Sequence, residues 1–289
     1  MVNDLPALNK HFQPGGGLCV TAVPAFSDNY IWLIHSPRHP QRVVAVDPGD
    51  AQTVIVELEK HGLQLAAIFV THHHDDHIGG VAGLIDAYSV PVFGCTSEHF
   101  QVNLLEVSEG QSVNLTELGL KFDVLNIPGH TQNHIAFTGH GSTFCGDTLF
   151  SAGCGRLFEG TPQQMTSSLA RLGRLPPSTQ LYCAHEYTVS NLNFATAVEP
   201  TNQIIQRHLV KAKSLRQQNL PTVPTTVALE SEINPFLRLN VPTVRQAACN
   251  YAGKVLDEES DVFAALRHWK DRFNSSYLGS KTAPSNMEK

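Results

Sequence analysis

Residues 71–80 read Thr71-His72-His73-His74-Asp75-Asp76-His77-Ile78-Gly79-Gly80, so six side chains that can bind a metal occupy the consecutive positions 72–77. The apolar run 65–70 before this stretch predicts a buried strand, and the glycines after it lead into a helix predicted over 82–88. The stretch is therefore expected to form a loop between a strand and a helix, where a rigid scaffold commonly holds reactive side chains. The alternative interpretation is a histidine-rich solvated tract, but such a tract would lack both the preceding strand and the following helix.

The spacing within this loop indicates which side chains converge. In an extended segment alternate side chains share one face, so His72, His74 and Asp76 are expected to converge while the residues between them point away. His77 follows at the start of the predicted helix. A single tetrahedral zinc ion needs only three protein ligands and a water, so four candidate ligands in one loop favour two cations.

Composition excludes several classes of protein. The chain has 289 residues, 42% of them apolar and 16% charged, which is typical of a soluble globular protein. Its formal net charge of −6 argues against a nucleic-acid partner, and no apolar run is long enough for a membrane span. The first residues resemble neither a signal peptide nor a transit peptide. Six cysteines without a C-x-x-C pair predict reduced, mostly buried thiols of a cytoplasmic protein. We also expect the protein to be a monomer.

The order of predicted elements indicates the architecture. Short β-rich runs cover 18–23, 30–35, 42–46, 91–94, 112–115, 121–127, 134–137, 142–145 and 181–183, and helices are predicted over 53–61 and 166–172. This alternation predicts the α/β class, as a four-layer αββα sandwich rather than a doubly wound sheet. After residue 187 the chain is predicted to be largely helical over 191–220 and 257–273. We therefore expect a flexible leader (1–17), an α/β domain (18–187), a smaller C-terminal α-helical domain (188–274) and a disordered tail (275–289).

Three further polar residues stand directly after predicted strands, in loops that contain small residues: His130, Asp147 and His185. Each alone has an ordinary explanation as a hydrogen-bonded or turn-forming group. Because strand-end loops at one edge of a sandwich form a single cleft, we expect all three to join the histidine stretch. The resulting five imidazoles and two carboxylates suit two borderline cations such as zinc, iron or manganese. Two such cations can share a water and lower its pKa, which makes a hydroxide nucleophile near neutral pH. The sequence contains no G-x-S-x-G motif, which would supply a serine nucleophile instead.

The H-x-H-x-D-H pattern over 72–77, with His130, Asp147 and His185 downstream, resembles the metallo-β-lactamase superfamily. Within it, the chain closely resembles the glyoxalase II (hydroxyacylglutathione hydrolase) family over about residues 18–274. The narrower resemblance rests on five motifs: Gly146-Asp147-Thr148-Leu149-Phe150, Gly153-Cys154-Gly155-Arg156-Leu157-Phe158-Glu159-Gly160-Thr161, His185-Glu186-Tyr187-Thr188, Asn234-Pro235-Phe236-Leu237-Arg238, and Arg267 with Lys270, Asp271 and Phe273.

The resemblance implies a ligand set and a reaction. One metal would take His72, His74 and His130, and the other Asp76, His77 and His185, with zinc as the expected metal. Asp147 and a hydroxide would bridge the two ions, and Asp76 would also orient the hydroxide. The implied reaction is hydrolysis of the thioester of S-2-hydroxyacylglutathione, typically S-D-lactoylglutathione, to D-lactate and glutathione in methylglyoxal detoxification.

The resemblance also implies the substrate contacts. Arg156 and Tyr187 fall on family positions that bind glutathione, and Arg267 and Lys270, three residues apart, fall on a pair that holds its glycine carboxylate. Phe158 stands where some relatives have a substrate-contacting tyrosine. Because glutathione is a net anion and this chain is acidic overall, a local basic patch must hold it. The turn at Asp28-Asn29-Tyr30 also resembles the family and is expected to be structural.

Two alternatives remain open from the sequence. One is an iron-dependent glutathione persulfide dioxygenase on the same fold, which needs only a site of two histidines and one carboxylate. The full set of seven candidate ligands argues against it. The other is a non-catalytic metal-binding module, against which the acidic balance and the open water position of a two-metal site argue.

Overall fold

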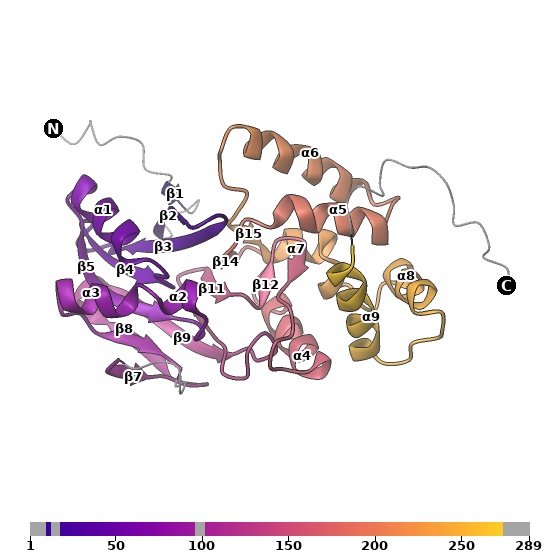
Figure 1. Ribbon diagram of the computed structural model, residues 1–289, viewed down its shortest axis with the longest axis horizontal. Coiled ribbons are helices and arrows are strands. Elements are labelled where there is room, and N and C mark those ends of the chain that lie inside the picture. The colour runs from indigo at the N-terminus through magenta and orange to yellow at the C-terminus, as the bar shows by residue number, and fades with distance from the viewer. Residues whose placement is uncertain (1–9, 13–17, 96–101, 274–289) are drawn as a thin grey trace.

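The computed structural model describes residues 10–12, 18–95 and 102–273 and shows two β-sheets packed face to face with helices outside them (Figure 1). The predicted tail over 275–289 lies outside the described residues. Of the predicted leader over 1–17, only Lys10–Phe12 are described, and they form strand β1. In the described part of the chain, no helix is both long and apolar enough to cross a membrane.

The first sheet has seven strands in the order in which they occur along the chain. Its first four strands are antiparallel, and the last three are added in parallel. The strands are β1 (Lys10–Phe12), β2 (Cys19–Ala25), β3 (Asn29–His35), β4 (Arg42–Val46), β5 (Gln64–Val70), β6 (Val92–Gly94) and β7 (Leu104–Glu106).

The second sheet has six strands in the order β15-β14-β11-β10-β9-β8, and only β11 and β14 are parallel neighbours. Its strands are β8 (Ser112–Leu115), β9 (Leu120–Asn126), β10 (Ile135–Gly139), β11 (Ser142–Gly146), β14 (Gln180–Cys183) and β15 (Thr225–Thr226). A separate hairpin pairs β12 (Leu149–Phe150) with β13 (Gly153–Cys154).

Nine α-helices and two 3-10 helices occupy the described residues. They are α1 (Ala51–His61), α2 (Asp75–Ile78), α3 (Val81–Tyr88), α4 (Pro162–Gly173), α5 (Thr188–Val198), α6 (Gln203–Gln217), α7 (Val227–Ile233), α8 (Pro242–Ala252), α9 (Glu259–Asp271), η1 (Thr116–Leu118) and η2 (Pro235–Leu237). In Figure 1 the orange and yellow helices α5, α6, α8 and α9 lie at one end of the molecule, beside the two sheets.

The core lies between the sheets, as the predicted αββα sandwich requires. Phe69 of β5 stacks on Phe137 of β10 with ring centroids 4.3 Å apart, and Trp32 of β3 meets Tyr182 of β14 edge-on at 5.0 Å. A second apolar cluster joins the outer face of the first sheet to α1 and α3. Helices α4, α8 and α9 bury apolar residues in the same core as the second sheet, whereas the buried apolar residues of α6 lie in a separate cluster with parts of α5 and α7. The predicted fold class is therefore confirmed.

Several boundaries differ from the sequence predictions for identifiable reasons. The helix predicted over 166–172 begins at Pro162, because Thr161 and Gln164 form a reciprocal capping box with proline at the first turn. The stretch predicted as one helical region over 191–220 is two helices, α5 and α6. The chain after residue 187 is not wholly helical, because β15 pairs with β14 in the second sheet. All six cysteines are free, but only three are buried, so the prediction of mostly buried thiols was wrong for half of them.

The strand directions bring four loops to one edge. β9 and β11 are each antiparallel to β10, and β14 is parallel to β11, so β9, β11 and β14 run in the same direction. Their carboxyl ends lead to His130, Asp147 and His185, and the carboxyl end of β5 leads to the histidine stretch. The sheets therefore deliver the predicted candidates to a common place.

We expect Phe69→Ala to lower the free energy of unfolding by about 3–5 kcal/mol, because it opens a cavity between the sheets two residues before the histidine loop. Phe69 is fully buried and also meets Phe93 and Phe122 edge-on. Chemical denaturation would measure the change. Val210→Ala, at an exposed position on α6, is the control and should change stability by less than about 0.5 kcal/mol. An equal effect of the two substitutions would contradict this account of the core.

Candidate metal centre

The histidine loop is extended only as far as His74, which caps the short helix α2 with extended dihedral angles. Alternation therefore explains why His72 and His74 share a side, but Asp76 reaches the cluster from a helical turn, and that part of the prediction was wrong. Gly49 allows this turn to lie close to the β4–α1 loop, since a Cβ at Gly49 would lie 2.0 Å from the Asp76 carbonyl oxygen. His73 points elsewhere and pairs with Glu159 at 2.9 Å.

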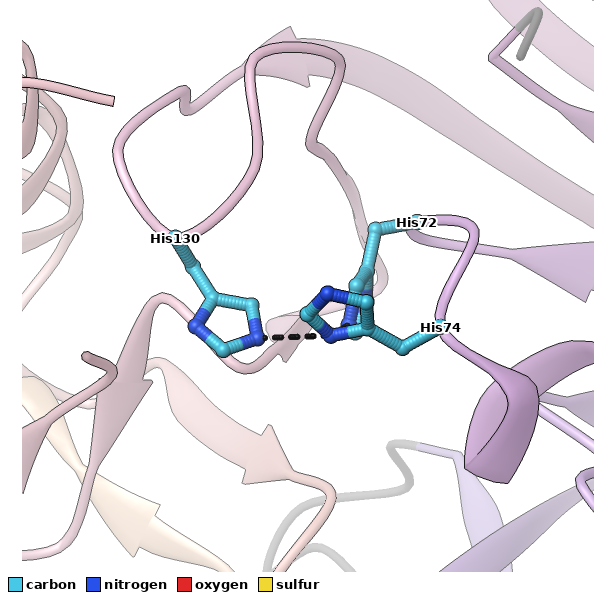
Figure 2. A group of neighbouring side chains, drawn as sticks. All are labelled: His72, His74 and His130. Carbon is cyan, nitrogen blue, oxygen red and sulfur yellow. Dashed lines mark hydrogen bonds between the residues drawn. The ribbon is translucent and has the colours of Figure 1, made fainter. Parts of the chain in front are cut away.

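Three imidazoles from two distant loops converge on one point. His74 Nδ1 lies 3.1 Å from His72 Nε2 and 3.0 Å from His130 Nε2. Figure 2 shows His130 approaching from its own loop, opposite the loop that carries His72 and His74. Nitrogens bound tetrahedrally at about 2.1 Å from a zinc ion would be about 3.4 Å apart, close to the observed separations.

Hydrogen bonds on the far side of these rings show that the facing nitrogens carry lone pairs. His130 Nδ1 lies 2.8 Å from the Arg156 carbonyl oxygen, which only accepts, so Nδ1 carries the hydrogen. Thr71 donates its hydroxyl to Asp47 and therefore accepts from His72 Nδ1, at 3.1 Å. Both Nε2 atoms then lack hydrogens, and His74 Nδ1 can donate to only one of them. A cation is the group that such a set of lone pairs would bind.

A second group combines imidazoles with carboxylates. The side chains of Asp76, His77 and His185 lie together, with Asp76 Oδ2 3.5 Å from His77 Nε2 and 3.4 Å from His185 Nε2. Asp147 lies between the two groups. Its Oδ1 is 3.5 Å from His77 Nε2, and its Oδ2 is 3.5 Å from His130 Nε2 and 3.3 Å from His185 Nε2. The structure thus brings all seven predicted ligand candidates together.

Some of the buried atoms that lack hydrogen-bond partners belong to the candidate ligands. Among the described residues, His77 Nε2 and Asp147 Oδ1 are buried and form no hydrogen bond. Leaving such atoms unsatisfied costs about 1–3 kcal/mol each, which a bound cation would remove. The residues present therefore fit a metal ion, both in the first group and around Asp147.

The two groups differ in their electrostatics. Burial lowers the pKa of His72, His74 and His130, so these three rings are neutral. Burial also disfavours charge on His77 and His185, but Asp147 outweighs it and raises both pKa values, that of His185 to about 10. The second group therefore attracts positive charge, which protons supply when no cation is bound.

The sequence predictions missed the residues that orient these rings. Asp47 Oδ2 lies 3.1 Å from His77 Nδ1, and Asp28 Oδ1 accepts from His185 Nδ1 at 2.8 Å. His134 stacks on His72 with ring centroids 4.5 Å apart and accepts the backbone N–H of Asp147 at 3.2 Å. The positive φ of 51° at the non-glycine residue Asp47 is a strained conformation of the kind found at functional sites. In the sequence, Asp28 and Asp47 stand only in turn-forming contexts, which gave no indication of these contacts.

We expect Asp28→Asn to weaken metal binding at the second group by about 10- to 100-fold, because the carboxylate that fixes the His185 tautomer is lost. Competition against a chromophoric chelator would measure the affinity. Ser27→Ala is a matched control, since it removes only a hydroxyl that donates to the other oxygen of Asp28, at 3.1 Å. If Asp28→Asn left the affinity within about twofold of the wild type, Asp28 would have no orienting role.

A cavity of about 460 Å³ lies beside the two groups of candidate metal ligands, and residues of helices α5 and α9 also line it. His130 and Asp147 line its inner end, and Arg156, Tyr187, Arg267 and Lys270 line its walls. Phe158 also lines it and lies against His130, with ring centroids 5.2 Å apart. All five predicted substrate-binding residues therefore border the same cavity.

Arg267 and Lys270 are placed differently within that cavity. The Arg267 side chain is 8% exposed, and its guanidinium donates to the Cys154 carbonyl oxygen at 2.9 Å and to Asp271 at 2.8 Å. The Lys270 ammonium donates to Ser190 Oγ at 3.1 Å. Arg267 is thus engaged within the protein, and it cannot present a bidentate fork to a ligand without losing these bonds.

Comparison with known proteins identifies the family. The model described as Metallo-beta-lactamase superfamily matches residues 26–185, and the model described as Hydroxyacylglutathione hydrolase C-terminus matches residues 186–273. A hydroxyacylglutathione hydrolase of Albidiferax ferrireducens is 52% identical over 256 residues, 87% of this chain and 98% of that protein. Its counterpart in Nitrosomonas europaea is 45% identical over 257 residues, 89% of this chain and 97% of that protein.

Among solved structures, TTHA1623 in a di-iron-bound form is similar in fold, with a TM-score of 0.52 and 26% identity, and the match covers 72% of this chain and 95% of that one. The superfamily fold implies binding of divalent metal, for which the histidine and aspartate groups are the candidates. Together, the two family models cover nearly all of the described chain in sequence order. The chain therefore belongs to the hydroxyacylglutathione hydrolase family of the metallo-β-lactamase superfamily.

Proposed function

We propose that the protein hydrolyses the thioester of S-2-hydroxyacylglutathione, with S-D-lactoylglutathione as substrate and D-lactate and glutathione as products. The observation that carries this proposal is the single cavity that joins the histidine and aspartate groups to the cationic side chains Arg156 and Lys270. The names of the two curated relatives described above support the same reaction.

We further propose that two divalent cations bind, zinc being preferred and iron or manganese also suited to imidazole and carboxylate ligands. The first would be held by His72, His74 and His130, and the second by Asp76, His77 and His185, with Asp147 shared. The convergence of lone pairs in the first group supports this, as does the di-iron form of TTHA1623. When bound, the cations would supply a water of lowered pKa and polarise the substrate carbonyl.

The chain's own residues would orient the reacting groups. Asn29 donates to Asp76 Oδ2 at 2.9 Å and so holds that carboxylate against His185. Tyr187 stacks on the His185 ring at 4.7 Å, and burial raises the pKa of its hydroxyl, which therefore stays protonated and can donate to the substrate. Phe158 covers His74 and His130 and limits the access of bulk water from that side.

The outer part of the cavity would hold the glutathione moiety. Lys270 and Arg156, whose side chain is 67% exposed, are the cations placed to meet its carboxylates. Arg267 would act mainly by supporting this wall through Cys154 and Asp271. The leaving group is a thiolate, which departs without an acid near neutral pH because thiol pKa values are about 8.5.

Turnover of S-D-lactoylglutathione by the purified, metal-loaded protein tests the proposal. We expect a kcat of about 10–10³ s⁻¹, read from loss of the thioester absorbance. Oxygen consumption with glutathione persulfide, measured in parallel, reads the rival dioxygenase activity. Absence of thioester turnover by a protein with a filled metal site would reject the proposed function.

We expect the KM for the substrate to rise above about pH 8, because Lys270 then loses its charge. Burial, and secondarily Arg267, lowers the pKa of Lys270 to about 8, so it is protonated below that pH and neutral above it. Lys270→Gln should raise KM by about tenfold at neutral pH and flatten the rise, because one charge-assisted contact is lost. Lys211→Gln, at an exposed position on α6, should reproduce the wild-type pH profile. A pH profile of KM that is the same in Lys270→Gln and the wild type would remove Lys270 from the substrate site.

A further inference from the structure

The cationic wall of the cavity contains its own carboxylate, Asp271. Asp271 Oδ1 accepts from Arg267 Nη2 at 2.8 Å and from Arg267 Nε at 3.2 Å. The same oxygen lies 3.7 Å from Arg156 Nε. One oxygen atom therefore contacts both guanidinium groups that border the cavity.

Asp271 occupies the part of Arg267 that would otherwise form a bidentate pair with a ligand carboxylate. A guanidinium binds a carboxylate most strongly through two parallel N–H donors, and here Nε and Nη2 both donate to Asp271. The third nitrogen, Nη1, donates to the Cys154 carbonyl oxygen, and the Arg267 side chain lies over the Phe236 ring. The whole guanidinium is thus bound within the protein.

The charged side chains that line the cavity determine how strongly a ligand carboxylate is attracted to it. Arg156, Arg267 and Lys270 line the cavity together with Asp271 and Asp147, so three cations face two anions, of which Asp271 contacts both guanidinium groups. The Asp271 side chain is 38% exposed and lines the cavity, so its negative charge acts on a ligand that is bound there. A bound carboxylate is therefore attracted by Lys270 and Arg156 and repelled at short range by Asp271.

We propose that Asp271 weakens the hold of the cavity on the glutathione carboxylate, so that the product is released rather than retained. The proposal rests on the proposed function. A purely structural role, in which Asp271 only positions Arg267, makes the opposite prediction for ligand affinity. In that case removal of the carboxylate would disorder the wall and weaken binding.

Calorimetric titration of reduced glutathione into the metal-loaded protein separates these two roles. We expect Asp271→Asn to bind glutathione about three- to tenfold more tightly than the wild type at low salt, since one repulsive charge is removed and the amide oxygen still accepts from Arg267. The gain should shrink as salt is raised from about 0.05 M to about 0.5 M. The titrations are made at about pH 6.5, where Lys270 holds its proton. In turnover assays the same variant should show product inhibition at correspondingly lower glutathione concentrations.

Two further variants control the comparison. Asp261→Asn makes the same change of charge in the first turn of the same helix, away from this cavity, and should leave glutathione affinity unchanged. Asp271→Ser also removes the charge and replaces Asp271→Asn if circular dichroism shows that the latter does not fold. Asp271→Glu keeps the charge and should bind glutathione within about twofold of the wild type.

Each outcome decides the matter. Weaker or unchanged binding by Asp271→Asn, with normal binding by the wild type, overturns this inference and leaves the proposed function intact. No binding of glutathione by the wild type, metal-loaded protein overturns the proposed function and this inference with it. Tighter binding that does not depend on salt would also overturn the inference, because the gain would not be electrostatic.

Discussion

Removal of metal by chelation will reduce hydrolysis of S-D-lactoylglutathione by about a thousandfold or more, because the proposed nucleophile is a water activated by the cations. Cys154 borders the cavity, but burial raises the pKa of its thiol to about 11, so it remains protonated near neutral pH. Burial likewise keeps Cys145 and Cys183 protonated. The imidazoles of His77 and His185 lie within 3.5 Å of the Asp147 carboxylate.

Dialysis against a chelator, followed by assay of activity and metal content, would make this measurement. Titration with zinc, iron or manganese should then restore activity and show which metals the site accepts, with a plateau near two ions per chain. Circular dichroism before and after chelation controls for loss of the fold. Turnover near the original rate in protein with less than about a tenth of an ion per chain would contradict a metal-dependent reaction.

Asp147→Asn is expected to lower kcat by about 10²–10³-fold, because it removes a carboxylate that lies between the two groups of candidate ligands. Asp147 is almost fully buried, and its two oxygens lie within 3.5 Å of His77, His130 and His185. Burial by itself raises the pKa of this carboxyl, but His77 and His185 lower it further than burial raises it, so the group is ionised. An amide of the same shape keeps the packing but loses the negative charge that two nearby cations need.

The assay should measure metal content as well as activity. A variant can lose activity either because one ion no longer binds or because turnover is slower with both ions bound. We expect Asp147→Asn to hold less metal than the wild type as well as to turn over more slowly. Asp86→Asn makes the same change of charge on the exposed face of α3 and should keep both properties within about twofold of the wild type. Wild-type metal content and activity in Asp147→Asn would show that Asp147 is not shared between the ions.

Residues that orient the seven candidate ligands are also part of the candidate site. Asp28 approaches His185 from a position 157 residues away in the sequence, and Asn29 approaches Asp76 across 47 residues. The turn that contains both was expected to be structural, yet its side chains contact candidate ligands of the second group. Gly146 is needed in the same region, since a Cβ there would lie 2.3 Å from Thr71 Oγ1 and would displace Asp147.

The sequence by itself determined the αββα sandwich and the seven candidate ligands. Apolar runs mark most of the core strands, and every candidate ligand stands in the segment between one of four strands and the next long element. The alternation argument failed at Asp76, because the extended backbone ends at His74 and α2 begins at Asp75. The family resemblance placed Arg156, Phe158, Tyr187, Arg267 and Lys270, and all five border one cavity.

Only the tertiary structure decided how these residues act. Whether Arg267 faces a ligand or a neighbour depends on Asp271 and on Cys154, which is 113 residues distant along the chain. The ring nitrogens available to a cation likewise depend on Thr71, Asp28 and the Arg156 carbonyl oxygen on the opposite side of each ring. The physical reason is that periodicity and turn propensity are local, whereas the tautomer and charge of a buried group are set by whichever donors and acceptors the fold places within about 3 Å of it.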